Sequence, residues 1–164
     1  MAIENKKNID PTEVDKFNML AHKWWDPTSE FKPLHEINPL RVNFIKSKLS
    51  LEGKSILDVG CGGGILAEAL ALEGAIVTGI DQGDKVIKIA ELHNKESKLN
   101  INYKNMNIED FFKKNKEKYD VITCLEMLEH VPDPSSIIKT CAQLLKPQGR
   151  IFFSTLNRNP KSFL

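Results

Sequence analysis

The sequence has little of what marks a membrane-spanning, extracellular or nucleic-acid-binding protein. No apolar run approaches the length of about 20 residues that a membrane-spanning helix needs, and the N-terminus lacks the basic-then-apolar layout of a secretory signal. The three cysteines are widely spaced without a CxxC pair, which favours a reducing compartment. A net charge of +1 argues against a nucleic-acid partner. These absences predict a cytoplasmic protein that is soluble or peripheral to a membrane.

The order of apolar segments predicts the fold class. Strand-like segments at 56–59, 76–80, 101–106, 121–124 and 150–154 alternate with helix-like segments at 65–72, 85–96 and 135–145. Such alternation predicts an α/β fold, a doubly wound and mostly parallel sheet with helices on both faces. Before it, a helix is expected at 10–25 with Thr12 as its N-cap, followed by an irregular segment at 26–39 and a helix at 39–49. We expect residues 1–50 to form a helical lid on the substrate side and residues 51–164 to form the core.

A glycine-rich loop follows the first predicted strand. Gly60, Gly62 and Gly64 alternate with other residues, and glycine lets the backbone adopt positive φ and approach a ligand closely. The helix expected from Ile65 points its partial positive end at the same place. A dinucleotide fingerprint requires glycine where Ile65 stands. The pattern Asp-x-Gly-x-Gly-x-Gly, which begins at Asp58, instead resembles motif I of the class I S-adenosylmethionine (SAM) methyltransferases.

The second predicted strand ends in a carboxylate, Asp81. It lies about 20 residues beyond the loop, as expected for an acid that accepts hydrogen bonds from ribose hydroxyls in a βαβ unit. The alternative is that Asp81 caps the helix that follows.

After the fourth predicted strand comes a polar turn. Leu125 stands where its backbone can meet a cofactor, and Glu126, Glu129 and His130 have the i, i+3, i+4 spacing that shares one helical face. Two carboxylates and an imidazole beside a cofactor site predict a divalent-metal site with open positions. The alternative is that Glu129 and His130 cap or salt-bridge the turn and Glu126 binds the ammonium group of SAM.

Several longer segments resemble one family, the ubiquinone-biosynthesis O-methyltransferases. They are Trp-Trp-Asp at 24–26, Glu-Phe-Lys-Pro-Leu-His at 30–35, Ile-Asn-Pro-Leu-Arg at 37–41, the glycine loop, Glu-Met-Leu-Glu-His-Val-Pro-Asp-Pro at 126–134 and Phe-Phe-Ser-Thr-Leu-Asn-Arg at 152–158. The resemblance runs from about residue 14 to the last residue. Because members of this family continue further, the chain is expected to be truncated and to lack the final antiparallel strands of the sheet.

The resemblance implies roles for individual residues. Arg41 would reach the SAM carboxylate, which suits a guanidinium, although a surface arginine on a helix is the alternative. Gly60 and Gly62 would line the methionine part, Asp81 would hold the ribose, and Leu125 would touch the cofactor through its backbone. Asn107 and Ile108 would lie near the adenine, with a plain loop at the strand exit as the alternative. The divalent ion of the family, expected to be Mg²⁺, falls on Glu126, Glu129 and His130.

The implied activity is methyl transfer from SAM to phenolic hydroxyls of polyprenylated ubiquinone precursors, 2-polyprenyl-6-hydroxyphenol and 3-demethylubiquinol. No catalytic base is assigned. Acceptors dissolved in lipid imply peripheral binding at the inner face of the membrane and a place in a ubiquinone-biosynthesis complex. Trp24, Trp25, Phe31 and Leu34 could cover the acceptor ring, form a lipid-facing edge, or pack in the core.

Other functions remain open at this point. The chain could be a non-catalytic SAM-binding or assembly module, or a class I methyltransferase with another small-molecule acceptor. A nicotinamide dehydrogenase is disfavoured by the glycine spacing.

Overall fold

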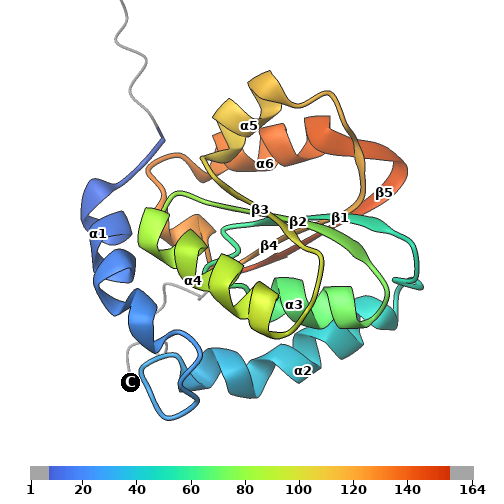
Figure 1. The fold of residues 1–164 in the computed structure, drawn as a ribbon. Coiled ribbons are helices and arrows are strands. Elements are labelled where there is room, and N and C mark those ends of the chain that lie inside the picture. The colour runs from blue at the N-terminus through green and yellow to red at the C-terminus, as the bar shows by residue number, and fades with distance from the viewer. Residues whose placement is uncertain (1–7, 156–164) are drawn as a thin grey trace, which may run out of the picture.

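A single parallel sheet lies at the centre of the computed structural model, which describes residues 8–155 (Figure 1). Its strands are β1 (Ser55–Val59), β2 (Ile76–Asp81), β3 (Asn102–Asn105), β4 (Tyr119–Leu125) and β5 (Leu145–Ser154), all in parallel pairs. Their order across the sheet is β3-β2-β1-β4-β5. The chain therefore winds outward from β1 on one side and resumes beside β1 at β4. In open α/β sheets that reversal leaves a ligand-binding crevice at the carboxyl ends of the two strands.

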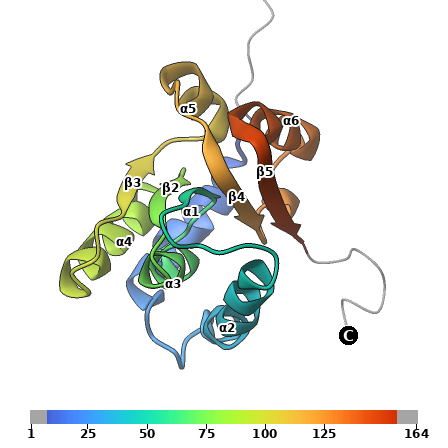
Figure 2. The ribbon, with the colours of Figure 1, turned by 90° about the vertical axis from the view of Figure 1, so that its right-hand side faces the viewer.

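Helices cover both faces of the sheet, as the doubly wound prediction requires. They are α1 (Pro11–Leu20), α2 (Lys32–Lys46), α3 (Ile65–Leu72), α4 (Asp84–Glu96), α5 (Ile108–Lys114) and α6 (Pro134–Leu144), with 3₁₀ turns η1 (Ala21–Lys23) and η2 (Leu128–His130). In both ribbon views α5 and α6 lie over one face and α2, α3 and α4 over the other (Figures 1 and 2). No helix within residues 8–155 combines the length and apolar composition needed to cross a bilayer.

The central strands β1 and β4 are buried on both faces, because successive side chains point to opposite faces of the sheet and helices cover both faces. Ile56 and Leu57 in β1 are both 0% exposed. Ile56 packs in the core under α2, α3 and α4, whereas Leu57 packs in the second core under α5 and α6. Burial on both faces explains why the sequences of β1 and β4 are mostly apolar and do not alternate between apolar and polar residues.

The N-terminal helices differ from the sequence prediction at their boundaries. Asp10, not Thr12, caps α1, because its Oδ1 accepts a hydrogen bond of 2.9 Å from the Thr12 N–H. The expected irregular segment at 26–39 is wrong in its second half, since α2 begins at Lys32 and contains Pro39. The helix tolerates this proline while burying Asn38, Val42 and Ile45, which is tertiary packing overriding a local preference.

The sequence did not predict α5, which occupies the stretch expected to be an exit loop from β3. Asn107 is its N-cap, and the Asn107 Oδ1 accepts a hydrogen bond of 2.7 Å from the Asp110 N–H. Lys113 and Lys114 form its last turn, where positive charge complements the helix dipole. The first two members of the lysine cluster Lys113, Lys114, Lys116 and Lys118 therefore end a helix.

An ion-pair network ties three strand starts together and gives a stability prediction. Asp120 Oδ2 lies 2.9 Å from Lys146 Nζ, 2.7 Å from Ser55 Oγ and 2.9 Å from the Ser55 N. These contacts, led by the Lys146 hydrogen bond, lower the pKa of Asp120 well below its usual range. We expect Asp120→Asn to cost about 1–3 kcal/mol in urea unfolding at pH 7.

A pH series checks the sign of this effect. A lowered pKa stabilises the fold above the usual carboxyl range, and this stability is lost as pH falls through and below that range. The difference between wild type and Asp120→Asn should therefore shrink toward pH 3. Asp84→Asn is the control, because the Asp84–Lys88 pair has side chains 53% and 73% exposed, and exposed ion pairs contribute little to stability. An equal cost from both variants would refute the network's role.

Candidate functional site

The glycine loop leaves β1 with three left-handed residues before α3 begins. Gly60, Gly62 and Gly64 have φ of 71°, 55° and 95°. The N–H groups of Gly60 and Cys61 both donate to the Ile80 carbonyl, at 2.9 and 3.1 Å. The loop is thereby held over the carboxyl end of β2.

Two of the loop glycines are required by a tryptophan. A Cβ on Gly62 would lie 2.1 Å from Trp24 Cζ2, and one on Gly63 would lie 2.3 Å from Trp24 Cγ. Trp24 is 6% exposed and stacks on Phe31 with ring centroids 4.1 Å apart. Both rings therefore pack in the core, as one of the sequence alternatives had it. The lack of side chains at Gly62 and Gly63 makes room for Trp24.

Two chambers open at the carboxyl edge and meet at Gly60 and Glu126, which line both. The first, here called the α1 chamber, lies under α1 and is lined by Asp10, Glu13, Val14, Phe17, Val59, Gly60, Ile80, Asp81, Gln82, Gly83, Met106, Asn107, Ile108, Glu126, Met127, His130, Val131 and Ile137. The second, the Arg41 chamber, is lined by Trp24, Leu34, Asn38, Arg41, Asp58, Gly60, Cys61, Ile65, Leu66, Leu125 and Glu126. Five of the predicted cofactor-binding residues thus line one site: Arg41, Gly60, Asp81, Ile108 and Leu125. The sixth, Gly62, lines neither chamber; its N–H donates to Asp81 and it packs against Trp24.

Asp81 ends β2 inside the α1 chamber. Its Oδ2 accepts a hydrogen bond of 3.0 Å from the Gly62 N–H, and its Oδ1 accepts one of 2.8 Å from the Gly83 N–H. Burial raises the pKa of Asp81, and these N–H groups oppose the rise. Because each carboxylate oxygen has two lone pairs, both oxygens can still accept a bond from a ligand hydroxyl.

Asp58, to which the sequence reading gave no binding role, supplies an unpartnered acceptor. It is 3% exposed, its Oδ1 accepts a 2.7 Å hydrogen bond from Thr123 Oγ1, and its Oδ2 has no partner among the described residues. Burial raises the pKa of Asp58 to about 6, with the Thr123 hydrogen bond opposing the rise. A buried polar atom without a partner is costly, so this oxygen suits a ligand donor in the Arg41 chamber.

Arg41 and Glu126 form an ion pair across the Arg41 chamber. Arg41 Nη2 lies 3.1 Å from Glu126 Oε1, and the two side chains are 14% and 24% exposed. Ser154 Oγ donates to the same Glu126 oxygen at 2.6 Å. An anionic ligand group that binds Arg41 must therefore compete with Glu126.

The three predicted metal ligands point to three different partners. Glu126 binds Arg41, Glu129 Oε2 accepts a 2.7 Å bond from Thr155 Oγ1, and His130 Nδ1 lies 2.7 Å from Glu13 Oε2. Glu126 has φ of 54° and precedes the short 3₁₀ turn η2, so the shared helical face that the spacing suggested does not form. Within residues 8–155 no three His, Cys, Asp or Glu side chains are grouped to hold a metal ion.

The contribution of α1 to the wall of its chamber was not predicted from the sequence. Glu13 and Phe17 both contact His130, Phe17 with ring centroids 5.2 Å apart in an edge-on arrangement. His130 therefore attaches α1 to the β4 exit. A helix with apolar residues one turn apart carries no sign of which distant turn it covers, so this contact could not be read from spacing.

Comparison with known proteins gives the family. Residues 32–163 match the model of a methyltransferase domain. Two curated relatives are named ubiquinone biosynthesis O-methyltransferase. The one from Pseudomonas savastanoi pv. phaseolicola is 59% identical over 157 residues, which are 96% of this chain and 68% of that protein. The one from Nitrosospira multiformis is 59% identical over 163 residues, 99% of this chain and 68% of that protein.

Solved structures share the fold. The magnesium protoporphyrin IX methyltransferase of Synechocystis PCC 6803 with bound SAM superposes with a TM-score of 0.73 at 23% identity, covering 87% of this chain and 73% of that one. Coclaurine N-methyltransferase superposes with a TM-score of 0.63 at 24% identity, over 78% and 37% of the two chains. At these identities the likeness concerns the fold.

Proposed function

The chain belongs to the ubiquinone biosynthesis O-methyltransferase family, and from this membership we propose that it transfers a methyl group from SAM to a phenolic hydroxyl of a polyprenylated ubiquinone precursor. The proposed acceptors are 2-polyprenyl-6-hydroxyphenol and 3-demethylubiquinol. The membership disfavours both a nicotinamide dehydrogenase and a non-catalytic binding module.

The observation that carries the proposal is the match between the two chambers and the two halves of SAM. The Arg41 chamber offers a guanidinium and the free Oδ2 of Asp58, which complement the carboxylate and ammonium of the methionine half. The α1 chamber offers the Asp81 carboxylate for a ribose diol and the apolar side chain of Ile108, 2% exposed, for a purine face. Gly60, which lines both, lies where the halves would join.

The work of these residues is binding and orientation. When bound, SAM would supply an electrophilic methyl group on its sulfonium to the oxygen of the acceptor. Asp58 and Arg41 would hold one end of the cofactor and Asp81 the other, so that the junction at Gly60 is fixed. Fixing a reacting centre between two anchored ends lowers the entropic part of the barrier.

The predicted divalent cation has no support from the arrangement of its expected ligands. Glu126, Glu129 and His130 are each engaged elsewhere, and no step is assigned to an ion here. A Mg²⁺ site on these residues stays a prediction, and it would require each side chain to leave its present partner.

The chemistry of the acceptor supports a membrane-peripheral location. A polyprenyl tail partitions into lipid, so we propose that the protein meets its acceptor at the inner face of the membrane, as a cytoplasmic peripheral protein in contact with a biosynthetic complex. Three exposed apolar side chains in the N-terminal segment, on the proposed substrate side, fit this location. Met19 and Leu40 are each 67% exposed, and Phe44 is 57% exposed. Residues 1–50 would then serve as the lid.

The function is tested by calorimetric titration of the protein with SAM, followed by transfer of labelled methyl to a demethylated quinol with a short isoprenoid tail. We expect one SAM per chain and a labelled methyl ether. Binding of SAM without transfer to any phenolic acceptor would favour another acceptor class. No binding of SAM would refute the proposal.

Asp58 predicts a pH dependence of SAM binding. Its pKa is raised to about 6 by burial, so below that pH the group becomes neutral and cannot pair with the ammonium of SAM. We expect the Kd for SAM to rise as pH falls from 7.5 to 5, approaching about tenfold per pH unit below pH 6. The raised pKa affects the stability of the ligand-free protein in the opposite direction. The fold loses stability as pH rises through 6, because the charged form of Asp58 is disfavoured in the folded state.

The variant Asp58→Asn separates this effect from that of Asp81, whose pKa is also raised. The variant should bind SAM more weakly at pH 7.5 and should lack the part of the slope that belongs to Asp58. An unchanged slope in Asp58→Asn would show that another group is responsible.

A further inference from the structure

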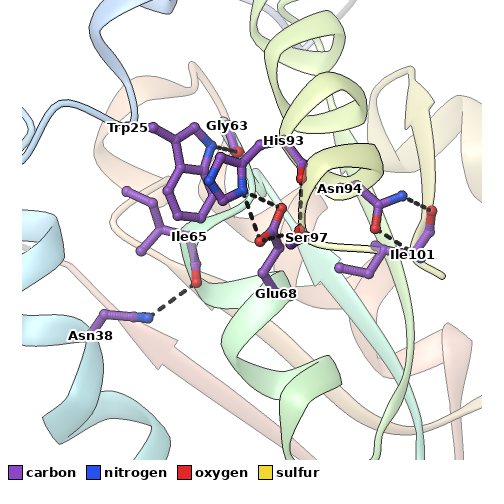
Figure 3. A network of polar contacts seen from close by, with 9 residues as sticks. All are labelled: Trp25, Asn38, Gly63, Ile65, Glu68, His93, Asn94, Ser97 and Ile101. Carbon is purple, nitrogen blue, oxygen red and sulfur yellow. Dashed lines mark hydrogen bonds and ion pairs between the residues drawn. The ribbon is translucent and has the colours of Figure 1, made fainter. Parts of the chain in front are cut away.

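Trp25 is held on its face and at its edge by groups far apart in the sequence (Figure 3). Its indole Nε1–H donates a hydrogen bond of 2.9 Å to the carbonyl of Gly63. Its ring stacks on the imidazole of His93 in α4, with ring centroids 3.5 Å apart and planes 3° apart. The segment that follows α1 is thereby fastened to the glycine loop.

His93 is itself fixed by a buried carboxylate. His93 Nδ1 lies 2.8 and 2.9 Å from the two oxygens of Glu68, and Ser97 Oγ donates to Glu68 Oε2 at 3.0 Å. Glu68 stands in the first turn of α3 and is 4% exposed. A buried carboxylate needs such partners, and they set the plane of the ring on which Trp25 stacks. Trp25, His93, Glu68 and Ser97 are called the loop clamp below.

The bond to Gly63 acts on the geometry of the loop. The peptide unit is planar, so fixing the Gly63 carbonyl also fixes the N–H of Gly64, which closes the turn by donating to the Cys61 carbonyl at 3.0 Å. Inside that turn the Gly62 N–H donates to Asp81 Oδ2. The loop is therefore held from one side by Asp81 and from the other by Trp25.

The loop clamp lies outside the proposed cofactor site. In the part of the chain that the structure describes, none of its four side chains lines the α1 chamber or the Arg41 chamber. Any effect on the cofactor must pass through the loop. We propose that Trp25, His93 and Glu68 are positioning residues for SAM, which preorganise the loop from Gly60 to Gly64; this inference rests on the proposed SAM-dependent function.

The alternative is that the clamp is only a brace for the fold. A brace would lower the melting temperature when broken and leave the SAM affinity of the folded protein unchanged. A positioning role raises the Kd for SAM at a temperature where every variant is fully folded. Calorimetric titration with SAM, paired with thermal unfolding, therefore separates the two roles.

Trp25→Phe keeps an aromatic ring for His93 and removes the N–H that binds Gly63. We expect this variant to raise the Kd for SAM about tenfold, the effect of losing one hydrogen bond to the loop. His93→Asn keeps an amide donor for Glu68 and removes the stacking surface, and it should raise the Kd by a similar factor. Both changes break the same chain of contacts, so their effects should not multiply. The Kd of the double variant should be at most about twofold higher than the Kd of the single variant that binds SAM less tightly.

His22→Asn is the matched control, since His22 is an exposed histidine in the 3₁₀ turn next to the same segment, and it should leave the Kd unchanged. Should Trp25→Phe fail to fold, His93→Asn decides the matter alone. If wild type binds SAM, two results would overturn the positioning role of the clamp. One is an unchanged Kd in both folded single variants, and the other is a double variant whose fold-change in Kd equals the product of the two single fold-changes. Failure of wild type to bind SAM would overturn the proposed function as well.

Discussion

Asp81→Ala is expected to reduce SAM affinity by more than about 100-fold, since hydrogen bonds to a charged group contribute about 1.5–3 kcal/mol each. Two losses combine in this variant. The proposed ribose hydroxyls lose their acceptor, and the N–H groups of Gly62 and Gly83 lose the oxygens that hold them at 3.0 and 2.8 Å. Calorimetric titration measures the combined loss of affinity, and thermal unfolding reports whether the second loss disturbs the fold.

A matched control and a modified ligand separate the two losses. Asp84→Ala removes a nearby carboxylate, 53% exposed and paired with Lys88, and should bind SAM as wild type does. A 2′-deoxy analogue of S-adenosylhomocysteine should bind wild type more weakly than the parent compound. Asp81→Asn, which keeps the loop partly held, should discriminate less between the two ligands. Equal discrimination in wild type and Asp81→Asn would mean that the ribose is bound by another group.

Arg41→Ala is expected to weaken SAM binding by about 100-fold, because truncating one side of a partly buried charge pair costs about 2–5 kcal/mol. Wild type should prefer SAM over decarboxylated SAM, and Arg41→Ala should bind the two equally. Glu126→Gln should have the opposite effect on SAM affinity. It removes the anion that Arg41 now binds at 3.1 Å, so SAM affinity should rise about fivefold while affinity for decarboxylated SAM stays constant.

The control for this pair lies on the same helix. Lys46 binds Glu73 at 2.6 Å with side chains 43% and 36% exposed, outside both chambers, so Lys46→Ala and Glu73→Gln should leave SAM affinity unchanged. A Glu126→Gln variant that binds SAM more weakly would instead assign Glu126 to the ammonium, the alternative that the sequence left open.

The sequence was most informative where a local pattern and a tertiary role coincide. The glycine spacing, Asp81 and the alternation of strands and helices led to the doubly wound sheet because each of these signals depends on backbone geometry within a few residues. Arg41 and Ile108 were predicted to belong to the site by the family resemblance, and Leu125 by its place after the fourth strand as well; all three line the two chambers.

Local patterns failed where distant contacts decide. α2 begins beside Phe31, which is buried against Trp24, and α5 buries Ile108 and Phe111 in the second core. Glu126, Glu129 and His130 have the spacing of a shared face, but the left-handed backbone at Glu126 breaks the turn. The partners of Trp25 lie 38 and 68 residues away at Gly63 and His93, beyond any local pattern.

The attachment of α1 has a kinetic consequence for an enzyme of the proposed kind. This ten-residue helix has no buried residue, yet Val14 and Phe17 form part of the wall of the α1 chamber. It is held by contacts such as the Glu13–His130 pair and the bond from the Lys85 N–H to Asn18 Oδ1 at 3.1 Å. We expect a helix without a buried residue to open more readily than the whole fold. The residence time of the proposed nucleoside half of SAM, and with it the rate of cofactor exchange, would then depend on how often α1 opens.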